Sequence, residues 1–251
     1  MTSVYDGARI AAGYAFDRPA VHERILLPLA AAPRAECALD VGCGAGRSTA
    51  ALAPYARTVV GLEPIASMLA HRSAVAPAAE FVVGEAERLP FARGSFDLVT
   101  AAGSLNYVDL DLFLPEAARV LTDGGRLYVY DFSEGRHAVG TDSLAGWFAA
   151  FEHHFPWPPG YRPLAPAALP WGEHGLRLVR CADTEVALEL TGAQYLRYVL
   201  SEVNVNAALA RGGSADEVVR WCTETLAPVF GSGSLRVRFC GYLAEAVRIA
   251  R

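Results

Sequence analysis

The sequence contains no lysine: all 22 basic residues are arginines, and they are spread thinly without a basic run. Nucleic-acid binding usually relies on clustered basic side chains, so a nucleic-acid partner is disfavoured, and the net charge of −5 agrees. There is also no run of the roughly 18 apolar residues that a membrane span requires. We therefore expect a soluble protein with neither nucleic acid nor membrane as a partner.

The cysteines and the first residues lack the marks of secretion and of metal binding. The five cysteines form no C-x-x-C pair and are odd in number, which is typical of reduced thiols and indicates no metal site. Residues 1–6 contain no charged segment followed by an apolar one, so a secretory leader is not expected. The sequence thus predicts a cytoplasmic protein.

The most informative stretch is a glycine-rich turn after an apolar run. Residues 37–41 predict a buried parallel strand, and Gly42, Gly44 and Gly46 then turn the chain into a helical pattern. Glycines let a backbone approach a ligand closely, so the turn is suited to a nucleotide-like cofactor. Asp40 ends the strand, where an unpaired carboxylate is costly, so we expect it to face polar partners in the turn or on the ligand.

A second apolar strand, residues 58–64, ends in an acid about 20 residues beyond the glycine turn. A carboxylate at this place can accept hydrogen bonds from both hydroxyls of a ribose, which makes Glu63 the predicted ribose ligand. A nicotinamide-dependent oxidoreductase shares the turn and this acid, so it remains an alternative.

Three stretches together resemble the class I S-adenosylmethionine (SAM) methyltransferases. Residues 39–46 match motif I of that family, Asp-x-Gly-x-Gly-x-Gly after an apolar run. Residues 84–91 are similar to its Gly-Asp-Ala-x-x-Leu-Pro-Phe segment, with Glu85 in place of the commoner aspartate, and residues 96–99 to its Phe-Asp-x-Val segment. A nicotinamide enzyme does not explain residues 84–91. Residues 14–19 resemble the Tyr…Arg-Pro signature of small-molecule methyltransferases related to the trans-aconitate enzyme.

The resemblance implies SAM as cofactor and a set of residues that bind it. In the family, the acid at Glu85 accepts a hydrogen bond from the adenine amine, Met68 presents an apolar group to adenine, and the segment around Tyr14 closes over cofactor and substrate. The full predicted set of cofactor-binding residues is Tyr14, Asp40, Gly42, Gly44, Gly46, Glu63, Pro64, Met68, Glu85, Ala86 and Ala101.

Strands alternating with helices over some 95 residues predict a doubly wound sheet. With the resemblance, we expect one α/β domain with a mainly parallel, seven-stranded, Rossmann-like sheet and helices on both faces. Residues 1–35 would form an N-terminal helical cap with a break at Pro19, 36–132 the SAM-binding core, 133–175 an inserted lid, and 176–251 the C-terminal strands and helices.

The lid segment is rich in aromatic residues, histidine and proline, which is typical of a pocket wall and equally of a packed aromatic core. As a pocket wall it favours an aromatic or hydrophobic substrate. The predicted substrate-binding residues are Tyr107, Trp147, Phe151 and Asn204.

The implied reaction is transfer of the SAM methyl group to oxygen, carbon or nitrogen of a small molecule, which we place in natural-product biosynthesis. A base is needed only where the nucleophile must lose a proton. The candidate bases are His153, His154 and His22, in that order, although the sequence favours a helix-surface histidine at each position. The alternative function is a cyclase or pericyclase that keeps the SAM fold without transferring methyl. A homodimer is possible.

Overall fold

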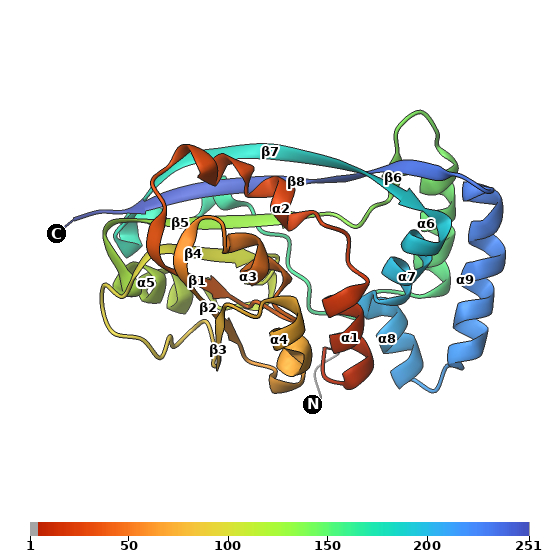
Figure 1. Cartoon of the computed structure of the whole chain (residues 1–251), viewed down its shortest axis with the longest axis horizontal. Helices are drawn as coiled ribbons and strands as arrows, with labels where there is room; N and C mark the ends of the chain where they lie inside the picture. The colour runs from red at the N-terminus through yellow and green to blue at the C-terminus, as the bar shows by residue number, and fades with distance from the viewer. Residues whose placement is uncertain (1–4, 251) are drawn as a thin grey trace.

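A computed structural model describes residues 5–250, and within them a central eight-stranded sheet (Figure 1). The strands are β1 Ala35–Val41, β2 Ala56–Glu63, β3 Glu80–Val83, β4 Phe96–Ala102, β5 Leu121–Phe132, β6 His137–Ala138, β7 Leu176–Thr191 and β8 Ser234–Arg248. Their order is β3-β2-β1-β4-β5-β8-β6, with β7 also paired to β8.

Strands β1 to β5 pair in parallel, whereas β8 runs antiparallel to β5, β6 and β7. The predicted doubly wound, mainly parallel sheet is confirmed, with the short β6 as an eighth strand. Chain order reverses between β1 and β4, because β1 leads to β2 on one side and pairs with β4 on the other. Ligands of such sheets bind beyond the carboxyl ends of the strands at this point.

Helices cover both faces of the sheet. The α-helices are α1 Ala8–Phe16, α2 His22–Ile25, α3 Arg47–Leu52, α4 Arg72–Val75, α5 Leu110–Val120, α6 Ser143–His154, α7 Gly192–Leu200, α8 Val203–Ala210 and α9 Ala215–Phe230. The 3-10 helices are η1 Leu27–Ala31, η2 Ala66–His71, η3 Leu105–Tyr107, η4 Pro166–Ala168 and η5 Trp171–His174. One apolar cluster joins α2 and α3 to the sheet, and a second joins α5 to the opposite face. Among residues 5–250, no helix combines the length and apolarity needed to cross a membrane.

Helices α6 to α9 form what we call the helical wall, at the far end of the long strands β7 and β8 (Figure 1). Three of them, α7 to α9, are inserted between β7 and β8. The sequence predicts a single helix near residues 194–211, but the structure has α7 and α8 there. The chain leaves helical geometry at Glu202, whose ψ is 147°, because this residue is the N-cap of α8.

The N-terminal segment consists of α1, a turn over residues 17–21, and α2, so the predicted break at Pro19 is present. Helix α1 lies between the sheet and the helical wall (Figure 1). Its buried residues Ile10, Ala11 and Ala15 share an apolar cluster with Ala45 of the glycine loop, Met68 of η2 and Val203 of α8. The segment is thus packed directly onto the glycine loop.

Candidate functional site

The glycine loop between β1 and α3 needs glycine for two different reasons. Gly42 has φ of 68°, and a Cβ atom there would lie 2.3 Å from Cβ of Ser104. Gly44 has φ of 55°, but the first atom its Cβ would meet is Cε of Met68, at 3.6 Å. Gly46, also left-handed, is the N-cap of α3. The loop is therefore pressed against the β4 side at Gly42 and leaves space at Gly44.

Asp40 is fully buried, and its carboxylate accepts three hydrogen bonds from hydroxyl groups of this chain. Oδ2 accepts from Ser48 at 2.5 Å and Thr49 at 2.7 Å, and Oδ1 accepts from Thr100 at 2.9 Å. Burial raises the pKa of Asp40, and the three hydrogen bonds oppose that rise. The predicted polar partners are thus in the chain itself. The side chain of Asp40 fixes the start of α3 to β1 and β4, and its contact with the cofactor stays a prediction.

Glu63 ends β2 with its carboxylate turned toward the glycine loop. Oε2 accepts a hydrogen bond from the amide of Gly44 and Oε1 from that of Ile65, both at 3.0 Å. Burial raises the pKa of Glu63, and the two backbone hydrogen bonds oppose this. A carboxylate oxygen can accept two hydrogen bonds, so each oxygen retains one free acceptor site. Its role as ribose ligand stays a prediction, and the two free acceptor sites match the two hydroxyl donors of a ribose.

The remaining predicted cofactor-binding residues differ in how far their side chains are exposed to solvent. Glu85 follows β3, is exposed, and its carboxylate has no hydrogen bond or ion pair with any described residue. Pro64 is exposed after β2, and Met68 lies beside Gly44. The side chains of Ala86 and Ala101 belong to the apolar cluster on the α5 side of the sheet, and contact of these residues with the cofactor stays a prediction. Glu85, Pro64 and Met68 remain predicted contacts.

Tyr14 of α1 lies under a buried ion pair. The Arg18 Cζ atom is 4.0 Å from the ring centroid of Tyr14, and Arg18 donates to both carboxylate oxygens of Glu202 at 2.8 and 3.1 Å. Burial raises the pKa of Tyr14 to about 12, although the charge of Arg18 opposes the rise. Tyr14 therefore keeps its proton at neutral pH. Its contact with cofactor or substrate stays a prediction.

The pair Arg18–Glu202 was missed from the sequence. Arg18 is part of a recognised signature, but Glu202 lies 184 residues further along the chain. No local spacing connects two such positions. The pair joins the N-terminal segment to α8 in the helical wall.

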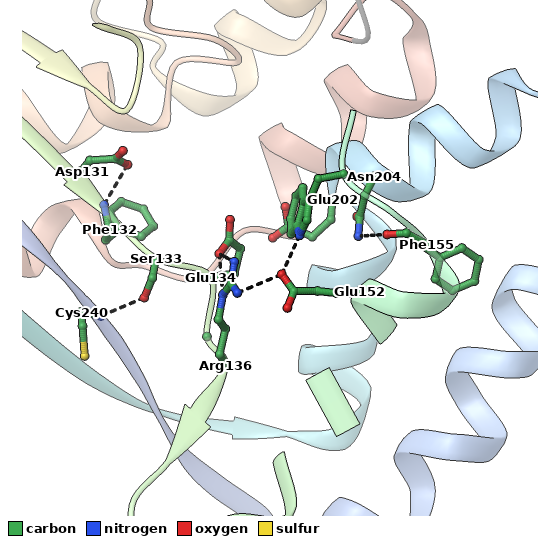
Figure 2. A network of polar contacts seen from close by, with 12 residues as sticks. Asp131, Phe132, Ser133, Glu134, Arg136, Glu152, Phe155, Glu202, Asn204 and Cys240 are labelled. Atoms are coloured by element: carbon green, nitrogen blue, oxygen red, sulfur yellow. Dashed lines mark hydrogen bonds and ion pairs between the residues drawn. The ribbon is translucent and has the colours of Figure 1, made fainter. Parts of the chain in front are cut away.

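The loop after β4 approaches the end of β5 through another pair that sequence reasoning did not find. Nδ2 of Asn106 donates to Oδ2 of Asp131 at 2.6 Å. Asp131 also accepts from the amide of Phe132 at 2.8 Å, as Figure 2 shows. An acid next to the end of strand five was the available signal for Asp131. Burial raises its pKa, opposed by the hydrogen bonds from Asn106 and Phe132.

Tyr107 in the same loop is 45% exposed and belongs to a group of tyrosines. The hydroxyl of Tyr5 donates to that of Tyr107 at 2.9 Å, and the ring of Tyr107 meets those of Tyr5 and Tyr161 edge to face. The N-terminal segment and the segment after α6 thus meet over the carboxyl end of β4. Substrate binding by Tyr107 stays a prediction.

Trp147, Phe151 and Asn204 are core residues, so the prediction that they bind substrate is corrected. Trp147 and Phe151 stack within the helical wall, with centroids 5.2 Å apart, and Trp147 donates its indole N–H to Thr225. Asn204 is fully buried and donates to the carbonyl of Phe155 at 2.8 Å. Figure 2 shows this bond, which ties α8 to the end of α6. Of the two interpretations of the aromatic segment, the packed core applies to these aromatics.

The two histidines at the end of α6 lie outside the candidate site. His153 and His154 are exposed in the last turn of α6, and the His154 ring stacks on Trp221 of α9 at 4.5 Å. Both histidines lie on the helical wall and not at the carboxyl edge of the sheet. Their positions match the surface histidines that were the alternative interpretation, and a role as bases stays a prediction without a supporting contact.

His22 is closer to the sheet but is a weak base. Its Nδ1 lies 2.9 Å from the hydroxyl of Tyr130, and its ring meets Tyr130 and Phe132 edge to face. Burial, with smaller contributions from Arg47 and Arg18, lowers the pKa of His22 to about 3. A base with so low a pKa takes a proton inefficiently at neutral pH. The low pKa of His22 thus argues against this histidine as the base.

A doubly wound sheet with a glycine loop after β1 and an acid at the end of β2 defines the class of α/β proteins that bind nucleoside cofactors. Residues 39–129 match the methyltransferase domain family. The chain is 42% identical over 99 residues to a demethylmenaquinone methyltransferase of Beutenbergia cavernae, covering 39% of this chain and 41% of that protein. It is 41% identical over 102 residues to an uncharacterized methyltransferase of Mycobacterium tuberculosis, covering 41% and 40%.

Among solved structures, a protein of Anaeromyxobacter dehalogenans described as a type II methyltransferase matches with a TM-score of 0.70 and 22% identity, over 93% of this chain and 97% of that one. This likeness shows the fold. The matches span about two fifths of the length of the two curated relatives. Residues 39–129, which match the methyltransferase domain family, contain the three motifs at residues 39–46, 84–91 and 96–99 on which the predicted resemblance rests.

Proposed function

We propose that the protein is a SAM-dependent methyltransferase acting on a small molecule. The observation that carries the proposal is the carboxylate of Glu63 beside the open side of the glycine loop. Its oxygens are oriented by the amides of Gly44 and Ile65, and each keeps one acceptor site. Two acceptor sites on one oriented carboxylate fit the two adjacent hydroxyls of a ribose.

The residues around Glu63 fit the remainder of a nucleoside. The space beside Gly44 is bounded by Met68, an apolar neighbour for a base, and the unpartnered carboxylate of Glu85 follows the adjacent strand β3. In this proposal Glu63 binds the ribose, Glu85 the adenine amine, and Met68 one face of the ring. When bound there, SAM supplies an electrophilic methyl group. The protein contributes mainly orientation and exclusion of water.

The acceptor would lie beyond β4 and β5, where Tyr5, Tyr107 and Tyr161 meet. Aromatic side chains supply large apolar contact area with a polar tip, which supports an aromatic or hydrophobic small molecule as acceptor. The relative named for demethylmenaquinone supports the same class. As part of this proposal, the reaction belongs to natural-product biosynthesis in the cytoplasm.

The first experiment measures SAM binding by calorimetry for the wild type, Glu63→Gln and the control Glu80→Gln. Glu80 is an exposed acid at the start of β3. Losing one charged acceptor of two hydroxyl groups should weaken binding about 100-fold in Glu63→Gln. The control should bind as the wild type does. Equal binding by Glu63→Gln and wild type would contradict the proposed site.

The second experiment measures S-adenosylhomocysteine by mass spectrometry after incubation with SAM and a panel of phenols, amines, indoles and carboxylic acids. Product with any class supports methyl transfer. SAM binding without product across the panel would leave two interpretations: a substrate outside these classes, or the cyclase or pericyclase alternative.

A further inference from the structure

Asp131 is an acid without a basic partner in a region where the other acids have one. Glu134 and Glu152 both pair with Arg136, as Figure 2 shows, and Glu202 pairs with Arg18. No ion pair among the described residues includes Asp131, and its neighbours Asn106, Phe132 and Tyr161 are all neutral. A half-buried carboxylate without a counter-ion is costly and needs a reason.

The residue that holds Asp131 has an unfilled acceptor of its own. Asn106 is 3% exposed, and while its Nδ2 donates to Asp131, its Oδ1 is buried with no hydrogen-bond partner in residues 5–250. A buried acceptor left unpaired costs about 1–3 kcal/mol. The carboxylate of Asp131 accepts hydrogen bonds from Asn106, Phe132 and Tyr161 but has no counter-ion, and the unfilled acceptor of Asn106 lies beside it. A ligand that carries a donor group would suit this pair.

These two residues lie next to the glycine loop. Ser104 donates to the carbonyl of Val41 at 2.8 Å, and it is the residue that a Cβ atom at Gly42 would strike. Asn106 follows two residues later and reaches Asp131 at the end of the next strand, β5. The contacts therefore run from the cofactor loop to Asp131 without a break. In the proposed function, an acceptor molecule would lie beyond these strand ends, next to a cofactor held by the glycine loop.

We propose that Asp131 binds and deprotonates the nucleophile, so that the substrate attacks the methyl carbon through the oxygen or nitrogen of an ionisable O–H or N–H group. This inference rests on the proposed function. A lone pair of the substrate oxygen or nitrogen forms the bond to the methyl carbon, and the bond from that carbon to sulfur breaks with its electrons on sulfur. The proton of the O–H or N–H group passes to a carboxylate oxygen of Asp131. Charge and atoms balance without a further reactant.

The surroundings of Asp131 are suited to a base. Burial and the charge of Glu134 raise its pKa, and the hydrogen bonds from Asn106 and Phe132 limit the rise. The other titratable groups facing it are Tyr107, Tyr161 and Tyr242, whose own pKa values burial raises, so they stay neutral. A carboxylate with a raised pKa accepts protons better near neutral pH. Asn106 acts through Asp131 as a positioning residue.

The test compares Asp131→Asn with the control Asp216→Asn, an exposed acid of α9. The acceptors are para-substituted phenols of graded acidity, with primary amines and enolisable carbon acids alongside, and S-adenosylhomocysteine is quantified. We expect Asp131→Asn to lose about 100-fold or more of turnover with the least acidic phenols. The loss should shrink toward p-nitrophenol, which is already ionised at pH 8. SAM affinity should be unchanged, which also shows that the variant folds.

A pH series separates a base from a structural residue. Wild-type turnover should rise with pH through the pKa of Asp131. In Asn106→Leu that limb should move to higher pH, because the hydrogen bond that favours the charged form is gone. Full turnover by Asp131→Asn with every acceptor, or product from carbon acids alone, would overturn the inference while leaving methyl transfer intact. Failure of SAM binding, or no product from any acceptor, would instead overturn the proposed function, and the inference with it.

Discussion

Buried polar groups in the sheet and in the helical wall differ in how far along the sequence their hydrogen-bond partners lie. In the sheet, Asp40 binds Ser48 and Thr49, eight and nine residues away, and also Thr100, 60 residues away. Glu63 binds Ile65 and Gly44, two and 19 residues away. In the wall, Glu202 binds Arg18, 184 residues away, and Asn204 binds Phe155, 49 residues away. Each of these acids of the sheet thus has at least one partner within a short motif, whereas these two residues of the wall depend on contacts that only the folded chain creates.

The largest loss of stability should come from removing one ring of the aromatic core of the helical wall. Phe151→Ala removes a fully buried ring that packs against Trp147 and Phe148, so we expect a loss of about 4 kcal/mol in the free energy of unfolding. The control Phe16→Ala removes a ring that is 55% exposed and should cost less than about 1 kcal/mol. Urea unfolding followed by circular dichroism measures both. Equal losses would contradict the assignment of Phe151 to the core.

Breaking the long-range ion pair should cost about 3 kcal/mol. Arg18→Met leaves Glu202 buried without its counter-ion. The double variant Arg18→Met, Glu202→Leu removes both charges and should recover most of the loss in the same unfolding assay. A double variant no more stable than Arg18→Met would show that the pair itself does not account for the effect.

In the sheet, Asp40→Asn weakens the hydrogen bonds that join β1 to α3 and to β4. The charged acceptor of the hydroxyls of Ser48, Thr49 and Thr100 is lost, so we expect about 2 kcal/mol of destabilisation together with weaker SAM binding. Asp142→Asn, at an exposed position whose side chain caps no helix, is the control and should change neither quantity. Weaker binding without destabilisation would instead assign Asp40 a direct contact with the cofactor.

His22 links the N-terminal segment to the sheet in a way that depends on pH. Its pKa is lowered from its ordinary value of about 6.5 to about 3, chiefly by burial. Between these values the unfolded chain binds a proton that the folded chain does not, so stability falls as pH drops through this window and is complete above it. In His22→Gln, the fall in Tm between pH 7 and pH 5 should be smaller by about 4–8 °C, which corresponds to about 2 kcal/mol. An unchanged fall would show that His22 is not buried as described.

The smallest effect should come from the histidines of α6. His153→Ala and His154→Ala alter exposed side chains of the wall, so each should change the free energy of unfolding by less than about 0.5 kcal/mol. Turnover at saturating SAM should equal that of the wild type. A large loss of turnover in either variant would restore a histidine as the base.

The same difference explains which features the sequence could predict. The five parallel strands, the glycine loop and the position of Glu63 follow from patterns a few residues long, and the structure contains them. Trp147 and Phe151 could not be assigned, because an aromatic residue in an irregular segment has the same composition whether it lines a pocket or fills a core. The role proposed for Asp131 could not be predicted from the sequence, because it depends on a contact with Asn106 of the loop after the neighbouring strand β4.

The last residue of β7 and the first of β8, Thr191 and Ser234, are paired across the sheet. Paired residues of antiparallel strands lie only about 5 Å apart, so the whole segment from 192 to 233 leaves and re-enters the sheet at a single point. A tight turn or a different set of helices could occupy that point without altering the register of a single strand. Evolution could therefore exchange this part of the molecule as a unit, provided that the new segment also replaces the contact of Glu202 with Arg18.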